Sequence, residues 1–431
     1  MQFCKTMFKI KRYNYLFFAM VLCVTVRGFA QNHLNSPYSR FGLGDLMPRT
    51  STAVTAMGGT GYTFQSATAV NFTNPASYMG FDTLSFLLDA SFSWKNQTLL
   101  ASTTQRGSTF NFDYLSAGFS IAKWWKTAVG VQPYSLMNYT IREEKTIDSA
   151  KQILSYLGEG GINEVFWGNS FKLFKNFSFG INASVLFGIS AKTRSIEWND
   201  SYHFNTNIES ANKIRGAVVT LGAQYFIPIK EKGDLGLGFV YTPPIPVRAI
   251  ETNTISTSLN TGTAHGTLPI DTLYPLSPVK RSLAMPTQIG GGISWGKKDK
   301  YFVGVDVTWK NWSSYKVDNV KDTMLSDVLK LSIGSSYTPN AMSNKFFPRM
   351  TFSLGVKVEQ TYLFLKNEHL KQFGINFGLL FPLKRSKTAL GLVFEYGQMG
   401  TTKNNLIKEN YYIIGINLRI HERWYQRKKL D

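Results

Sequence analysis

The sequence has almost no cysteine and no long apolar segment beyond its first thirty residues. Its two cysteines, Cys4 and Cys23, both lie within those thirty residues. The rest of the chain therefore cannot form a disulfide, a thiolate metal site or a cysteine nucleophile. No run of eighteen apolar residues follows residue 30, which excludes transmembrane helices there. A membrane protein with this sequence would have to be a closed β-barrel.

Charged residues are also scarce, and acids are the rarer kind. Only 17% of the 431 residues are charged, whereas 14% are aromatic and 36 are glycine. This composition favours many aromatic-rich strands punctuated by glycine over helical bundles or disorder. Beyond residue 30 the chain has 42 basic and 27 acidic residues, a net charge of +15. An anionic lipid surface attracts such a charge as well as nucleic acid does.

The first thirty residues contain no acid and have the features of a secretory signal. Basic residues between Lys5 and Arg12 precede an apolar run at 15–26, and the small residues Gly28 and Ala30 follow it. About twelve apolar residues are too few to span a bilayer as a helix, so we expect a signal peptide at 1–30 that is cleaved after Ala30. Cys23 lies inside the apolar run without small residues before it, which disfavours lipidation. Export makes anionic lipid, and not nucleic acid, the expected partner.

Apolar residues alternate with small or polar ones along most of the remaining chain. The pattern is clearest at 177–191, 301–309 and 372–381, where one face is apolar and the other is mainly Gly, Ser and Asn. Period-two alternation over ten residues is typical of barrel strands between lipid and lumen. A soluble β-sandwich would have a polar face richer in Lys, Glu and Thr. Eleven further segments carry weaker versions of the pattern: 84–95, 109–122, 126–141, 162–173, 215–227, 234–241, 287–296, 327–338, 349–360, 388–397 and 408–421. The sequence therefore predicts an all-β fold, a transmembrane antiparallel β-barrel of about 14 strands over residues 83–421.

The links between these segments alternate in length. The short, basic links are 123–126, 174–176, 229–233, 297–300 and 383–387, and the long, polar links are 142–161, 192–214 and 242–286. Bacterial barrels have short turns in the periplasm and long loops outside the cell. We expect 242–286 to be a mobile extracellular loop, or else a loop that docks a partner. Residues 422–431 would form a basic periplasmic tail.

Residues 31–82 do not alternate, and fifty residues ahead of the first strand need a place to pack. They contain Gly58-Gly59 and the tripeptide Asn74-Pro75-Ala76. At this point the chain resembles the long-chain fatty acid transporter (FadL-like) family of outer-membrane proteins, as a Bacteroidetes-type member. That family has fourteen strands and a hatch inside the lumen with an Asn-Pro-Ala motif. The resemblance implies that 31–82 is an N-terminal luminal hatch, although both motifs could also be simple turns.

Members of this family release hydrophobic substrates sideways through a gap at a kinked third strand. Pro133 lies in the third predicted strand and lacks the N–H that a sheet ladder needs. Pro133 is therefore the candidate for a lateral opening, with an ordinary β-bulge as the alternative.

Four charged residues are expected to point into the lumen: Asp306, Lys310, Glu395 and Arg419. They would guide a polar head group, or they would pair with one another or with the hatch.

The sequence offers no catalytic or metal-binding constellation. The five histidines are His33, His203, His265, His369 and His421, and none is placed as the base of a hydrolytic triad. We therefore expect no enzyme activity, no catalytic residue, no metal site and no cofactor.

Two functions fit the outer-membrane barrel. The resemblance implies passive uptake of hydrophobic, fatty-acid-like small molecules past the hatch. The alternative is a non-transporting subunit or partner-binding component of an outer-membrane secretion or assembly machine, because relatives in the Bacteroidetes type 9 secretion system act as shuttles for secreted proteins. The expected partners are outer-membrane lipids, a hydrophobic small molecule and, in the second case, other envelope proteins.

Overall fold

The computed structural model describes residues 36–147, 150–200, 202–230, 232–260, 267–275, 277–383 and 386–423. The signal peptide expected at 1–30, the first residues of the expected hatch at 31–35, and residues 424–431 of the expected tail lie outside these ranges.

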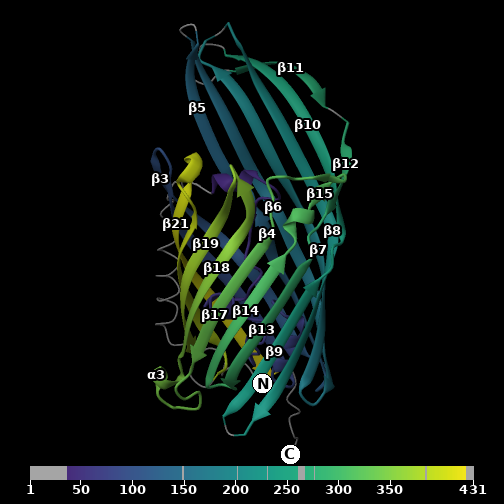
Figure 1. Cartoon of the computed structure of the whole chain (residues 1–431), viewed down its shortest axis with the longest axis vertical. Coiled ribbons are helices and arrows are strands. Elements are labelled where there is room, and N and C mark those ends of the chain that lie inside the picture. Colours follow the sequence, from purple (N-terminus) through teal and green to yellow (C-terminus); the bar gives the residue numbers. More distant parts are fainter. Residues whose placement is uncertain are drawn as a thin grey trace, which may run out of the picture.

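The described chain forms a closed antiparallel barrel of fourteen strands, which confirms the predicted fold class. Each strand pairs with its neighbours around the ring, and β21 closes the ring by pairing with β2 from Ser85–Arg423 to Leu100–Lys408. All fourteen alternating segments correspond to wall strands (Figure 1). The wall strands are β2 (Ser85–Leu100), β3 (Thr104–Ser120), β4 (Trp125–Leu136), β6 (Ala150–Phe174), β7 (Phe177–Trp198), β8 (Phe204–Ile229), β9 (Gly233–Thr242), β13 (Gln288–Lys297), β14 (Tyr301–Lys310), β17 (Val328–Tyr337), β18 (Thr351–Leu365), β19 (Glu368–Pro382), β20 (Ala389–Gly400) and β21 (Lys408–Arg423).

The remaining elements are short or lie beyond the wall. The additional strands are β1 (Asp45–Leu46), β5 (Tyr139–Ile147), β10 (Pro246–Asn260), β11 (Thr267–Pro275), β12 (Val279–Ala284), β15 (Lys316–Val317) and β16 (Val320–Lys321). The helical turns are η1 (Pro37–Arg40), α2 (Thr52–Thr55), η2 (Pro75–Gly80), η3 (Trp312–Ser314), α3 (Phe346–Arg349) and η4 (Lys403–Asn405). Among the described residues, no helix is both long and apolar enough to span a bilayer.

Alternation along the strands separates an apolar outer face from a polar inner face. On β7, Val185 and Phe187 point outward and are 48% and 42% exposed, whereas Asn182 and Ser184 point inward and are buried. Leu186, which breaks the alternation, is buried inside. Exposed aliphatic and aromatic side chains recur on the outer face of every wall strand. Such an extended apolar surface is unusual for a soluble monomer.

The two ends of the barrel differ (Figure 1). At the lower end, where α3 lies, most strands are joined by short turns, including those expected to be short. At the upper end β6, β7 and β8 continue well past the barrel and pair with β5 and β10.

The expectation that 142–161, 192–214 and 242–286 are loops is wrong for most of their length. These segments form β5, the upper parts of β6, β7 and β8, and strands β10, β11 and β12. Their polar composition hid the strands because above the apolar wall neither face of the sheet has to be apolar.

Candidate functional site

The segment from residue 36 to 84 packs inside the barrel. Its first part, η1 and β1, lies at the upper mouth against Ile407 and the upper end of β4, and residues 49–84 descend into the lower lumen. Figure 1 shows the segment as the purple trace behind the wall strands. Val54, Val70, Ala76 and Tyr78 are completely buried there. The segment is largely irregular, and its longest helical element is η2 with six residues. Its position therefore depends on contacts with the wall.

Glycines of the wall allow the backbone of this segment to approach closely. A Cβ atom at Gly180 of β7 would collide with the backbone of Pro75, and one at Gly355 of β18 would collide with the backbone of Met57. Gly334 of β17 is likewise covered by Met57. These wall glycines act as sockets for the segment.

Gly58 and Gly59 follow α2 and have φ angles of +68° and +90°. This left-handed region strains other residues, so the turn requires glycine. A Cβ atom at Gly58 would also lie 2.7 Å from the backbone nitrogen of Val356 in β18. The pair thus turns the chain directly against the wall.

Asn74 links the segment to β8 and begins η2. Its fully buried side chain accepts a hydrogen bond from the Ala76 N–H (3.0 Å) and donates to the carbonyls of Tyr62 (2.7 Å) and Ala223 (3.2 Å). Pro75 occupies the first position of η2, where a missing N–H costs nothing. The tripeptide therefore caps η2, begins it and anchors it to the wall.

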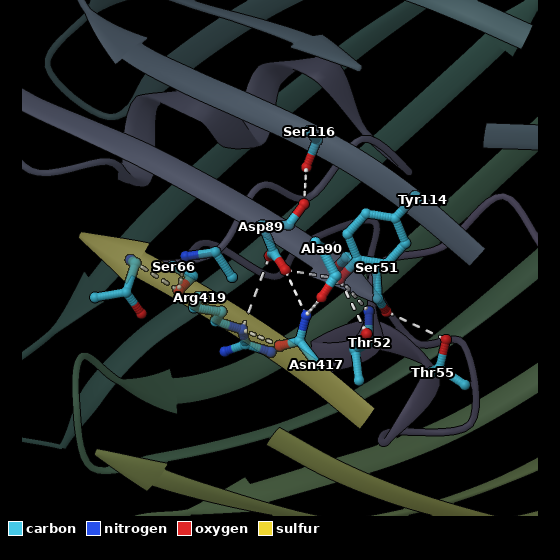
Figure 2. Close-up of polar contacts among 12 residues, drawn as sticks. Ser51, Thr52, Thr55, Ser66, Asp89, Ala90, Tyr114, Ser116, Asn417 and Arg419 are labelled. Carbon is cyan, nitrogen blue, oxygen red and sulfur yellow. Dashed lines mark hydrogen bonds and ion pairs between the residues drawn. The ribbon is translucent and has the colours of Figure 1, made fainter. Parts of the chain in front are cut away.

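A buried polar network holds α2 across the seam between β2 and β21 (Figure 2). Asp89 of β2 accepts hydrogen bonds from Asn417 Nδ2 of β21 (2.6 Å) and from the Tyr114 hydroxyl of β3 (2.9 Å). The Tyr114 oxygen in turn accepts the Thr52 N–H of α2 at 3.0 Å. Arg419 Nε lies 3.8 Å from Asp89. Both charges are almost completely buried, so each depends on the other.

Two further inward acids bind the segment. Asp306 of β14 accepts the N–H groups of Gly61 (2.7 Å) and Tyr62 (2.8 Å). Glu164 of β6 lies 2.6 Å from the Arg49 guanidinium. Burial lowers the pKa of Arg49, but the Glu164 carboxylate outweighs that effect and raises the pKa overall. Arg49 therefore stays charged within the lumen.

A cavity of about 270 Å³ lies between the segment and the upper wall. Its lining combines apolar side chains with many charges. The charged lining residues are Asp45, Arg49, Lys95, Asp113, Lys310, Lys330, Lys357, Glu359, Glu395 and Glu409. Lys357 and Glu395 pair at 2.6 Å. Within the described part of the chain, Lys310 and Lys330 on neighbouring strands have neither a hydrogen bond nor an ion pair.

The ladder between β3 and β4 is incomplete next to this cavity. β3 pairs with β4 only from Leu115 to Ser120. Above that point, residues 104–114 of β3 pair with β2 and, in the described ranges, with no strand on their other edge. The freed edge of β4 instead pairs with β1 of the N-terminal segment.

Pro133 lies where β4 leaves β3. On the opposite edge of β4 the pairing with β6 continues, but it shifts register between Pro133 and Ser135. The Tyr134 carbonyl accepts the Met47 N–H at 3.0 Å. Asn111 of β3 and Pro133 both line the cavity, one from each side of the break.

The structure thus places the ten site residues of the sequence prediction in four groups. Gly58, Gly59, Asn74, Pro75 and Ala76 lie at the contact between segment and wall, with Asp306 opposite them. Lys310 and Glu395 line the cavity, Pro133 lies at the break, and Arg419 belongs to the seam network.

Sequence reasoning missed Asp89, Tyr114, Asn417, Glu164 and Lys330. Asp89 and Glu164 are acids at inward positions of alternating strands, a signal that the sequence does contain. Their partners lie up to 328 residues away, and no spacing rule predicts such pairs.

Comparison with known proteins identifies one family and several solved structures with the same fold. The BamG family model matches residues 9–431. No curated protein sequence matches the chain.

Solved structures with the same fold include two toluene transporters and a FadL homologue. The toluene transporter TbuX of Ralstonia pickettii is 14% identical, with a TM-score of 0.57 over 89% of this chain and 100% of that one. The toluene transporter TodX of P. putida is 14% identical, with a TM-score of 0.57 over 87% and 98%. A FadL homologue of Pseudomonas aeruginosa is 13% identical, with a TM-score of 0.55 over 89% and 100%.

Proposed function

The chain belongs to the BamG family, and from its barrel with an apolar outer wall around a luminal cavity we propose that it is an outer-membrane channel for passive uptake of hydrophobic small molecules. The proposal also states that the signal peptide directs export, that the protein is a Bacteroidetes-type family member, and that residues 31–82 act as a hatch. The apolar wall supports the membrane location because its side chains would be unfavourable in water. Proteins of the same fold are described as toluene transporters and a FadL homologue.

The observation that carries the proposal is the break between β3 and β4. Cavity-lining Asn111 and Pro133 lie on its two sides. The outer surface beside it is aromatic: Phe92 stacks on Phe110 at 5.9 Å and packs edge-on against Phe112 at 5.6 Å. An apolar molecule that left the cavity here would meet aromatic rings and the lipid core, and would not cross water.

The cavity lining has five bases and five acids, and two of these bases, Lys310 and Lys330, favour a substrate with an acidic head group. Lys310 and Lys330 line the cavity without a hydrogen bond or close ion pair among the described residues, and Glu359 is the acid that interacts with both of them. A carboxylate would give them the charge-assisted hydrogen bonds that they lack. We therefore propose fatty-acid-like substrates, with Lys310 and Lys330 as contacts of the head group.

Blocking the break tests the route. Asn111→Trp places an indole in the cavity beside the break, whereas Val358→Trp places an indole on the outward face of β18, away from the break, where Val358 is 47% exposed. We expect uptake of a fluorescent long-chain fatty acid by cells to fall with Asn111→Trp and to persist with Val358→Trp. Equal uptake by both variants would refute passage at the break.

Removing these two lysines tests the substrate class. The double variant Lys310→Gln/Lys330→Gln should lower fatty-acid uptake about tenfold, the effect of one lost charge-assisted hydrogen bond. Toluene uptake, measured in parallel, should not change because toluene has no head group. A similar loss for both substrates would contradict the assignment of these lysines.

The filled lower lumen and the sheet projecting from the upper end favour a second candidate, a non-transporting subunit of an outer-membrane secretion or assembly machine. Mild detergent extraction from the native membrane followed by mass spectrometry distinguishes the two. A stoichiometric protein partner without bound amphiphile would favour the subunit. A lone barrel with bound fatty acid would favour the channel.

A further inference from the structure

A cluster of cations lies on the outer surface where the projecting sheet meets the barrel. We name it the basic patch and define it by six exposed residues. They are Lys213 and Arg215 of β8, Arg248 of β10, Lys280 of β12, Lys316 of β15 and Lys321 of β16. These strands are neighbours in one continuous sheet, and the labels β8, β10, β12 and β15 lie together in Figure 1.

Strand register brings like charges together within the patch. Arg248 pairs directly with Arg215 across β8 and β10, and Lys316 pairs directly with Lys321. Lys213 pairs with Ile250, which in turn pairs with Lys280. Like charges at directly opposite positions destabilise a sheet.

No acid in the described ranges forms an ion pair with the patch, and Asp322, which follows Lys321, acts on Lys192 and Tyr315. None of the six patch side chains forms an ion pair or hydrogen bond in those ranges. The nearby acids Glu251 and Asp318 are both bound to Arg281, at 2.8 Å and 2.9 Å. Glu209, on the outward face of β8, lies four residues beyond Lys213 and pairs with Thr254. The patch therefore keeps an uncompensated positive charge.

The patch begins where the apolar wall ends. The outward positions of β8 from Ile229 up to Ala217 are all uncharged, and Arg215 is the first charge on that face. On the adjacent β7, Phe187 and Ile189 pair with Arg215 and Lys213 and are 42% and 54% exposed. Cations directly above an apolar belt lie at the height of lipid head groups.

We propose that the basic patch binds phosphate-bearing head groups of the lipid in the leaflet at the upper end of the barrel. The planar guanidinium groups of two arginines and the ammonium groups of four lysines can donate hydrogen bonds to phosphate oxygens. A bound diphosphorylated lipid relieves the repulsion between Arg215 and Arg248. The acyl chains of the lipid then lie along Phe187 and Ile189. The inference rests on the membrane location in the proposed function, and it is independent of whether molecules pass through the lumen.

The test compares two charge-matched variants of the full-length protein in detergent. The patch variant is Lys213→Gln/Arg215→Gln/Arg248→Gln/Lys280→Gln. The control variant, Lys230→Gln/Lys232→Gln/Lys298→Gln/Lys300→Gln, removes the same charge from two lower turns. The probes are diphosphoryl lipid A and its dephosphorylated form, and binding is measured by native mass spectrometry. Resistance of the folded barrel to unfolding in SDS verifies that both variants fold.

We expect the patch variant to bind diphosphoryl lipid A at least about tenfold more weakly than wild type, which corresponds to one or two lost phosphate contacts. The control variant should bind like wild type, and the dephosphorylated lipid should bind all three proteins equally weakly. Equal binding of diphosphoryl lipid A by the patch and control variants would overturn the proposal. Loss of a co-purifying protein with unchanged lipid binding would assign the patch to a protein partner instead. Fatty-acid uptake, measured separately, reports on the channel and not on the patch.

Discussion

The lower and upper halves of the lumen are built from the same strands but differ in how their polar groups are satisfied. In the lower half Asp89 and Asp306 each bind the N-terminal segment or its anchors, and glycines bring the two backbones into contact. In the upper half a cavity remains, Lys310 and Lys330 have no hydrogen bond or close ion pair among the described residues, and β3 leaves β4. Filling has made the lower half a fixed floor, and the cavity lies between this floor and the residues 36–47 that cover the upper mouth.

Among the changes considered, loss of a buried anchor of the N-terminal segment should lower the stability of the barrel most. Asp89→Ala removes the acceptor for Asn417 and Tyr114 and leaves Arg419 buried without a countercharge. We expect the free energy of unfolding to fall by about 3–5 kcal/mol, measured by urea titration in detergent. The exposed pair of Glu143 and Lys145 provides the control, since Glu143→Ala should cost less than about 1 kcal/mol. Comparable losses for both variants would contradict the role of the network.

Loss of a glycine socket should have the next largest effect. At Gly355→Val the new side chain meets the backbone of Met57, so the segment must move. We expect a loss of about 1–3 kcal/mol and faster proteolytic cleavage within residues 36–84.

The matched control for the socket is Gly291→Val. At Gly291 an added Cβ would have its nearest neighbour at 3.9 Å, so the valine fits. Equal protease resistance of the two valine variants would show that Gly355 is not a socket.

The cap at Asn74 should contribute a smaller amount of stability. Asn74→Ala removes the acceptor for the Ala76 N–H and two donors to the Tyr62 and Ala223 carbonyls. A lost cap costs about 0.5–2 kcal/mol. Thermal unfolding followed by circular dichroism measures the change. An Asn74→Asp variant keeps the cap acceptor but places a buried carboxylate oxygen against the Tyr62 and Ala223 carbonyls, so we expect it to be less stable than Asn74→Ala. A fully stable Asn74→Ala protein would argue that the tripeptide is only a turn.

The smallest expected effect depends on pH at the lower end. Burial raises the pKa of Asp82, but the hydrogen bond and charge of Lys387 outweigh it and lower the pKa overall. A lowered carboxyl pKa stabilises the fold at pH values above the unfolded pKa, and the contribution is lost as the pH falls through the folded pKa. Between pH 6 and about pH 3 we expect a loss below about 1 kcal/mol that is absent in Asp82→Asn. An unchanged pH dependence in Asp82→Asn would show that Asp82 does not cause the loss of stability.

The sequence predicted the wall better than the site. Alternation located β7 at 177–191 because each position there faces either a lipid-like surface or a crowded lumen. It placed β8 at 215–227, although the strand runs from Phe204 to Ile229, because the upper part faces water on both sides. Pro133 was identified from its missing N–H, yet the departure of β3 depends on β1 pairing with β4. Such long-range pairings leave no periodic trace in the sequence.

The seam network also has a consequence for the order of events during folding. β2 and β21 are the first and last wall strands, and their junction completes the ring. Asp89 and Asn417, one from each strand, meet there and hold Tyr114, which binds α2. A ring that closed before the N-terminal segment entered would leave Asp89 and Arg419 facing an open lumen, and Tyr114 without its contact to Thr52. We therefore expect insertion of the segment and closure of the ring to be coupled, since the seam network is complete only in a barrel that holds the segment.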